Sequence, residues 1–172
     1  MIKIRNGCFE TNSSSVHAMI ISKEEVSPAN VTVHFDIGEY GWEEREYHDI
    51  DDKASYFYTA ACAVKGHDVE DEITNMLSPY GIKCKFGIAK FESYKSSYDN
   101  KTYTYLNNGY VDHEYDCADF VNAMMNDPDM LVRFLFNDDS FVHTGNDNSE
   151  MEWFDDIRAM TYPPHDLFVK GN

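Results

Sequence analysis

Basic residues and long apolar runs are both scarce in this sequence of 172 residues. It contains 14 Lys and Arg against 31 Asp and Glu, which gives a net charge of −17. Because proteins that bind DNA or RNA neutralise phosphates with Lys and Arg, we expect no direct binding of nucleic acid. No apolar run approaches the roughly 18 residues of a membrane-spanning helix, and residues 1–10 lack the apolar core of a signal peptide. We therefore expect a cytoplasmic protein without membrane attachment.

Cysteine is also sparse, and the motifs of common cofactor and metal sites are missing. The four cysteines, Cys8, Cys62, Cys84 and Cys117, form no Cys-x-x-Cys pair, so we expect reduced thiols. The sequence has no Gly-x-x-x-x-Gly-Lys-Ser/Thr loop, no dinucleotide fingerprint, no Gly-x-Ser-x-Gly turn and no zinc-finger spacing. We expect neither a cofactor nor a metal.

Aromatic residues are abundant. The 12 Tyr, 11 Phe and 2 Trp give a chain of this length enough bulk for a hydrophobic core. No internal repeat, proline-rich linker or low-complexity tract marks a boundary, so we expect a single domain over residues 1–172.

Strand and helix patterns occur in separate blocks. Period-2 alternation predicts half-buried antiparallel strands at 31–37 and 82–88, and further strands are expected at 1–5, 16–22, 101–106 and 140–143. Helical spacing predicts helices over 54–65, 69–77, 117–124, 130–135 and 151–160. Because these blocks do not alternate as βαβ units do, we predict an α+β fold in which helices cover an antiparallel sheet mainly on one face.

A row of small hydroxyl and amide side chains precedes the predicted strand at 16–22. Such a row can present hydrogen-bond donors to an oxyanion, and a hydroxyl near a histidine can become a nucleophile. The same residue types also form turns by bonding to their own backbone. If the segment is extended, Ser15 and His17 share a face. The candidate catalytic residues are Asn12, Ser13, Ser15 and His17.

The run from Phe9 to His17 resembles the N-terminal signature of a group of small proteins from phages and Firmicutes genomes that have no assigned activity. Two later segments, Asp138-Asp139-Ser140-Phe141 and Gly145-Asn146-Asp147-Asn148, resemble a second region of that group. The resemblance implies a mobile-element context in the cytoplasm of a bacterial host. In that context small acidic proteins often block host defence, as some anti-CRISPR proteins do.

Acidic residues are concentrated in two stretches. Residues 36–52 contain eight acids and one base, and residues 138–156 contain seven acids and no base, with Trp153 among them. These acids suit either a solvated face or an interface to a basic partner, in which charge sets the association rate and buried aromatics set the affinity. The predicted partner contacts are Glu43, Glu44, Glu46, Asp49, Asp51, Asp52, Asp138, Asp139, Glu150, Glu152, Trp153, Asp155 and Asp156.

The charge, its placement and the resemblance together predict a non-enzymatic inhibitor. We expect it to mimic DNA and to bind the basic nucleic-acid channel of a host defence effector, with a Cas9-type nuclease as the first candidate. Two alternatives stay open. One is a small enzyme that uses the Asn12, Ser13, Ser15 and His17 segment. The other is a phage accessory or assembly protein in which the acids serve solubility and the aromatic residues serve self-association.

Overall fold

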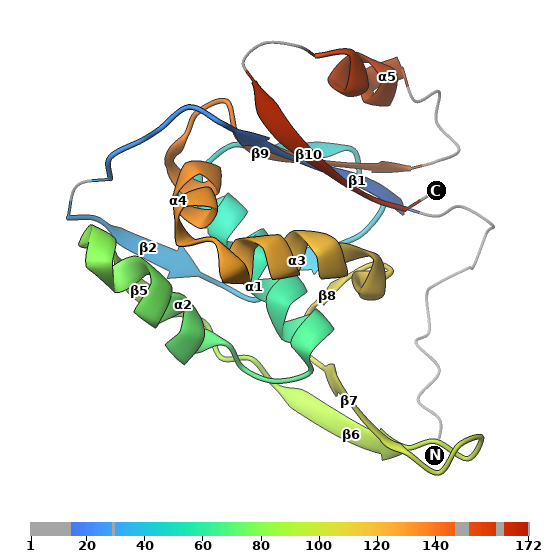
Figure 1. Ribbon diagram of the computed structural model, residues 1–172. Helices are drawn as coiled ribbons and strands as arrows, with labels where there is room; N and C mark the ends of the chain where they lie inside the picture. The colour runs from blue at the N-terminus through green and yellow to red at the C-terminus, as the bar shows by residue number, and fades with distance from the viewer. Residues whose placement is uncertain (1–14, 29, 147–151, 161–163, 172) are drawn as a thin grey trace.

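A four-stranded antiparallel sheet forms one layer of the protein (Figure 1). The computed structural model describes residues 15–28, 30–146, 152–160 and 164–171. The strands lie in the order β10, β1, β9 and β4, so β1 and β10, the first and last strands described, are neighbours. Their bounds are Ser15–Ser22 for β1, Arg45–Tyr47 for β4, Phe141–Asn146 for β9 and His165–Lys170 for β10.

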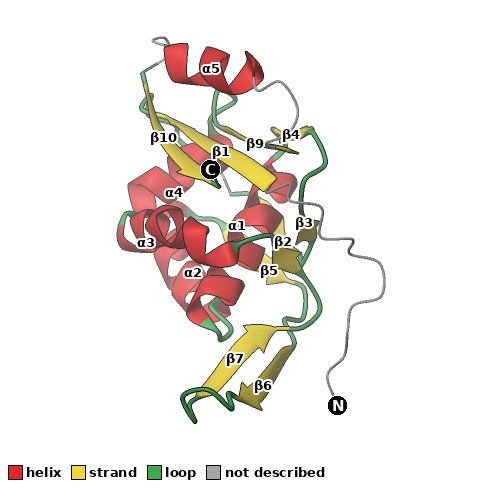
Figure 2. Ribbon diagram, turned by 90° about the vertical axis from the view of Figure 1, so that its right-hand side faces the viewer, coloured by secondary structure: helices red, strands yellow, loops and turns green. Residues whose placement is uncertain are grey.

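Helices cover this sheet mainly on one face. Helices α1, α3 and α4 lie on that face, whereas α5 lies on the other (Figures 1 and 2). The predicted α+β fold is therefore confirmed. The bounds are Ile50–Lys65 for α1, Glu70–Leu77 for α2, Ala118–Asn126 for α3, Pro128–Phe136 for α4 and Glu152–Ala159 for α5, with short 3₁₀ turns at Ser78–Tyr80 and Glu114–Cys117.

The strand β1 is buried along its whole length because both of its faces are covered. Met19 and Ile21 face α1 and α4 and belong to the main core. The alternate residues Val16, Ala18 and Ile20 form a second cluster with Ile157 of α5. The predicted strand at 16–22 is confirmed, and its near-continuous apolar sequence agrees with burial on both faces.

The strands β2 (Thr32–Phe35) and β5 (Lys83–Phe86) confirm two predicted strands, but the predicted antiparallel direction is wrong. They pair in parallel, with Val33 opposite Cys84 and Phe35 opposite Phe86. The reason is the connection, because α1 and α2 lie between the two strands in sequence and return the chain in the same direction. Phe35 and Phe86 also stack, with ring centroids 5.0 Å apart.

Two further strand pairs complete the fold. The short strands β3 (Glu39–Tyr40) and β8 (Tyr110–Val111) pair in parallel. The strands β6 (Phe91–Lys95) and β7 (Thr102–Leu106) form an antiparallel hairpin that extends away from the helices (Figure 2). β7 was expected, whereas β3, β4, β6, β8 and β10 were not. The expected strand at 1–5 lies outside the described residues.

Local sequence signals explain where α4 begins. The side chain of Asp127 accepts a hydrogen bond of 2.9 Å from the backbone N–H of Met130, and Pro128 occupies the first helical turn. Asp is favoured at this position because it satisfies a backbone donor that the helix leaves unpaired, and proline lacks such a donor.

In the part of the chain that the structure describes, no helix combines the length and apolarity needed to cross a bilayer.

Phe120 of α3 joins three layers of the core. Its ring contacts Phe57 of α1 edge to face at 6.1 Å, Phe134 of α4 at 5.4 Å and Phe168 of β10 at 5.8 Å between centroids. The side chain is 1% exposed. Removing it would leave a cavity shared by α1, α4 and the sheet.

We expect the change Phe120→Ala to lower the free energy of unfolding by about 3–5 kcal/mol, because both apolar contacts and packing are lost. Phe120→Leu should cost about 1 kcal/mol, since it preserves most of the volume. Urea unfolding followed by circular dichroism measures both. Tyr98→Ala is the control because Tyr98 is 99% exposed. Equal losses for Phe120→Ala and Tyr98→Ala would contradict this role.

Candidate functional site

The two acidic stretches meet where β4 pairs with β9. In that register Glu46 lies opposite His143, and His48 stacks on Phe141 with ring centroids 4.8 Å apart. This pairing brings the residues that follow β4 next to those that precede β9. We give the name acidic edge to the exposed carboxylates of β4 and of the segments on either side of it, together with the two that precede β9: Glu43, Glu44, Glu46, Asp49, Asp51, Asp52, Asp138 and Asp139.

A buried lysine lies between the two halves of the acidic edge. Lys53 of α1 is 1% exposed, and its Nζ donates hydrogen bonds to the backbone oxygens of Asn137 at 3.0 Å and Ser140 at 2.8 Å. Burial lowers the pKa of Lys53 to about 8, while the charges of Asp138 and Asp49 act in the opposite direction. Both carboxylates therefore act on one ammonium group, which ties the start of α1 to the loop before β9.

Some acids of the edge also stabilise local structure. Asp51 accepts a 2.9 Å hydrogen bond from the backbone N–H of His34, which joins α1 to β2. Glu46 accepts from His48 and His143 at 3.0 and 3.1 Å, and the hydrogen bond from His48 is the main cause that lowers the pKa of Glu46. These two residues are less suitable for charge substitution than Glu44, Asp52 and Asp139.

Four other predicted contacts belong to α5 and not to this edge. Asp155 and Asp156 are exposed on α5, which lies on the opposite face of the sheet from α1. Glu152 and Trp153 also lie in α5. Glu150 lies outside the described residues. Among the described acids of the second stretch, Asp138 and Asp139 lie beside the segment 49–53, whereas Asp155 and Asp156 lie apart from them on α5.

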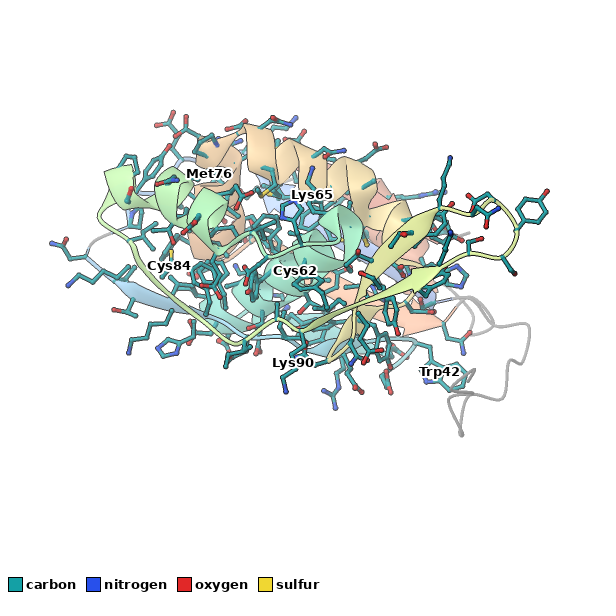
Figure 3. All side chains as sticks on the ribbon, turned by 90° about the horizontal axis from the view of Figure 1, so that it is seen from below. Trp42, Cys62, Lys65, Met76, Cys84 and Lys90 are labelled. Atoms are coloured by element: carbon teal, nitrogen blue, oxygen red, sulfur yellow. The ribbon has the colours of Figure 1, made fainter. Side chains whose placement is uncertain are left out.

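An exposed tryptophan that the sequence reasoning missed lies beside the acidic edge. Trp42 precedes Glu43 and Glu44, and its side chain is 47% exposed at the periphery of the molecule (Figure 3). An exposed tryptophan next to carboxylates combines the charged and aromatic contacts typical of protein interfaces. The signal was the run Gly-Trp-Glu-Glu, whereas the prediction had assigned the aromatic role to Trp153.

Tyrosines line two hollows near the same loop. One of about 390 Å³ lies at the base of the β6–β7 hairpin and is bordered by Tyr94, Tyr105 and Glu114. A smaller one of about 120 Å³ is bordered by Glu39, Glu43 and Arg45. Tyr110 of β8 lines both hollows, so they lie next to each other. No pattern in the sequence assigns these tyrosines to a site, because tyrosines on short strands have no distinctive spacing.

The predicted catalytic histidine is buried inside the fold. Its Nε2–H donates to the backbone oxygen of Gly41 at 2.7 Å, since a carbonyl can only accept, and its Nδ1 accepts from the hydroxyl of Tyr56 at 2.9 Å. Burial lowers the pKa of His17 to about 3, and the charge of Lys170 acts in the same direction. His17 is therefore neutral, and the lone pair that a general base needs is already used.

Ser15 shares a face of β1 with His17, as expected, but its partners are different. Its hydroxyl donates to Asp112 Oδ2 at 2.7 Å, and the Nζ of Lys170 donates to both the hydroxyl and the backbone oxygen of Ser15. Burial lowers the pKa of Lys170, whereas Asp112 opposes that effect. Ser15 and Lys170 are both fully buried. This arrangement supports a structural role for Ser15 and Lys170, whose hydrogen bonds join β1 to β10. Asn12 and Ser13 lie outside the described residues.

Thiols and metal ligands add no further site. Cys62, Cys84 and Cys117 are free thiols, as expected, and Cys8 lies outside the described residues. Burial raises the pKa of all three, so they are poor nucleophiles at neutral pH. Within the described ranges, no group of three or more His, Cys, Asp or Glu side chains is placed to hold a metal ion.

Comparison of the chain with protein-family models, with curated proteins and with solved structures gave no match.

The buried neutral histidine generates a pH prediction. The pKa of His17 is about 3 in the folded protein against an ordinary value of 6.5, so below pH 6.5 the unfolded chain binds a proton that the folded protein does not. The free energy of unfolding must therefore fall as the pH falls through this range, by about 1.4 kcal/mol per pH unit. Between about pH 7.5 and about pH 5 we expect a loss of about 2 kcal/mol from His17 alone.

This contribution is measured by urea unfolding of the wild type and His17→Gln at both pH values. The variant should be less stable at neutral pH, because two buried hydrogen bonds change, but it should lack the additional loss on acidification. His34→Gln is the control, since the side chain of His34 is exposed. An identical pH dependence for the wild type and His17→Gln would contradict a neutral buried His17.

Proposed function

We propose that this protein is a non-enzymatic inhibitor that binds a basic, nucleic-acid-handling protein through the acidic edge. The observation that carries the proposal is the meeting of two acidic stretches, far apart in the sequence, where β4 pairs with β9. The acidic edge has eight exposed carboxylates, and Arg45 is the one exposed Lys or Arg among residues 43–52. Such a surface presents a negative potential to the groups that otherwise bind phosphates.

The partner that best suits this surface is a protein with a positively charged channel for nucleic acid. Its lysines and arginines bind phosphates mainly by charge, so carboxylates of comparable density compete for the same groups. A Cas9-type nuclease is the first partner to test, because its heteroduplex lies in a channel of this kind and because the N-terminal segment resembles mobile-element proteins. We place this activity in the cytoplasm of a bacterial host.

The buried side chains support binding rather than catalysis. His17 holds the backbone of Gly41 and therefore positions the loop that carries Trp42 and Glu43. Thr144 of β9 donates to the backbone oxygen of Glu43 at 2.6 Å and fixes the other end of that loop. A rigid loop loses little conformational freedom on binding, which favours affinity.

Charge reversal at the acidic edge tests the electrostatic part of the proposal. We expect the triple variant Glu44→Lys, Asp52→Lys and Asp139→Lys to lower the association rate with a guide-loaded Cas9-type effector by about tenfold or more at low salt. The loss should shrink as salt rises, because screening weakens the wild-type attraction. Surface plasmon resonance at two salt concentrations, together with inhibition of target-DNA binding, provides the measurement.

The matched control reverses three exposed acids elsewhere: Glu25→Lys, Glu72→Lys and Asp119→Lys. This variant has the same net charge as the edge variant, so a specific edge predicts a much smaller loss. If both variants lose the same fraction of the association rate, the attraction depends on the net charge of the protein and not on the acidic edge. Inhibition that needs far less than one equivalent would instead indicate an enzyme.

Trp42 tests the aromatic part of the same interface. Because aromatic anchors act after the encounter, we expect Trp42→Ala to raise the dissociation rate by about tenfold while the association rate changes little. Tyr98→Ala, another exposed aromatic residue, is the control. Wild-type dissociation of Trp42→Ala would remove Trp42 from the interface without affecting the charge result.

A further inference from the structure

The hollow at the base of the β6–β7 hairpin has walls of tyrosine. The rings of Tyr94 and Tyr105 lie with centroids 6.1 Å apart in an edge-to-face arrangement, and Tyr110 of β8 forms another wall. Ala63 and Leu106 contribute small apolar surfaces. The volume of about 390 Å³ is large enough for an amino-acid side chain or a small organic group.

The tyrosines are held in place by interactions outside the hollow. The hydroxyl of Tyr105 donates to Glu92 Oε2 at 2.9 Å, and Asn107 donates to the other oxygen of the same carboxylate at 2.7 Å. Tyr94 also stacks on Tyr103, with ring centroids 5.7 Å apart. These contacts orient aromatic faces before any ligand binds, which lowers the entropic cost of binding.

The charge at the hollow is negative. Among the described residues that line it, Glu114 is the only one with a charged side chain. The adjoining hollow, which Tyr110 also lines, is bordered by two acids and one base, Glu39, Glu43 and Arg45. A group that enters this region meets carboxylates together with the electron-rich faces of tyrosine rings.

We propose that the hollow lined by Tyr94, Tyr105, Tyr110 and Glu114 binds an arginine side chain presented by the protein's partner. Aromatic faces attract cations through their quadrupole, and a nearby carboxylate adds direct charge pairing. Arginine suits the hollow better than lysine because its planar guanidinium stacks on a ring while it donates to a carboxylate. A hard metal ion does not suit it, since one bordering carboxylate and phenol rings supply too few oxygen ligands.

This inference rests on the proposed function for the source of the arginine. A channel that binds phosphates is rich in arginine, and Tyr110 connects the hollow to the side where Glu43 of the acidic edge lies. One arginine of the partner would then be captured in the hollow while its neighbours face the carboxylates. The hollow adds a specific contact to a surface that otherwise acts through general charge.

The test uses a small probe, so it needs no partner protein. The full chain is titrated with N-acetyl-arginine methylamide, and binding is followed by two-dimensional nuclear magnetic resonance of the backbone amides. The lysine derivative carries the same charge, and the citrulline derivative has nearly the same shape without the charge. We expect saturable shifts around Tyr94, Leu106 and Glu114, with the arginine derivative binding more tightly than the lysine derivative and much more tightly than the citrulline derivative.

Two variants and two matched controls locate the binding. Glu114→Gln and Tyr94→Leu should each weaken binding of the arginine derivative by roughly five- to tenfold. Glu72→Gln and Tyr98→Leu change the same residue types at exposed positions that do not border the hollow, and they should bind the probe as the wild type does. Circular dichroism of each variant shows whether the fold is retained.

Three results would overturn the proposal: equal binding of the arginine and citrulline derivatives, equal binding of the arginine and lysine derivatives, or equal affinity for the wild type and Glu114→Gln.

Different results would contradict the proposed inhibitor function. If the protein binds no basic partner but the arginine derivative binds the hollow and saturates it, the arginine site is supported and the inhibitor function is contradicted. If variants of the acidic edge weaken partner binding but the arginine derivative does not bind, the arginine site is contradicted and the inhibitor function is supported.

Discussion

The burial of β1 on both faces is the constraint on which the rest of the structure depends. An eight-residue strand with no exposed residue must satisfy every polar group from within the protein. Ser15 and His17 therefore require partners, and these come from Asp112, Lys170, Tyr56 and Gly41. Through these partners β1 fixes the positions of α1, β10 and the loop between β3 and β4. Ser15 and His17, which look catalytic in the sequence, thus contribute to holding the fold together.

The same constraint places the acidic edge. β9 pairs with β1 on one side and with β4 on the other, so β1 holds in place the strand on which His143 lies opposite Glu46. Lys53 then joins the start of α1 to the loop before β9, where its ammonium lies under the influence of two carboxylates. Isolated acids at these positions would repel each other across the edge. A buried cation that attracts both offsets part of this repulsion without reducing the negative charge that faces solvent.

The sequence predicted local structure well and long-range pairing poorly, for physical reasons. The helices α1 to α4 follow from apolar spacing and from capping residues such as Asp127, which depend only on neighbours in the chain. β10 was missed because Lys170 is polar in sequence but buried in the fold, where its charge is compensated by groups that lie far away in the chain. The direction of β2 against β5 depended on the path of α1 and α2. Acids from both stretches lie beside one strand pair because the end of β4 meets the start of β9, a placement that no local pattern encodes.

If the proposed basic partner is bound, salt should act on the free protein and on the complex in opposite directions. In the free protein, a net charge of −17 and a crowded acidic edge give repulsion between carboxylates, and screening relieves it. In a complex with a basic partner, the same carboxylates are paired, and screening weakens the pairing. The repulsion present before binding therefore adds to the driving force for association at low salt. An acidic surface that served only solubility would show the stabilisation of the free protein by salt, because screening still weakens its repulsion. It would show no weakening of a complex by salt, because its carboxylates would bind no basic partner.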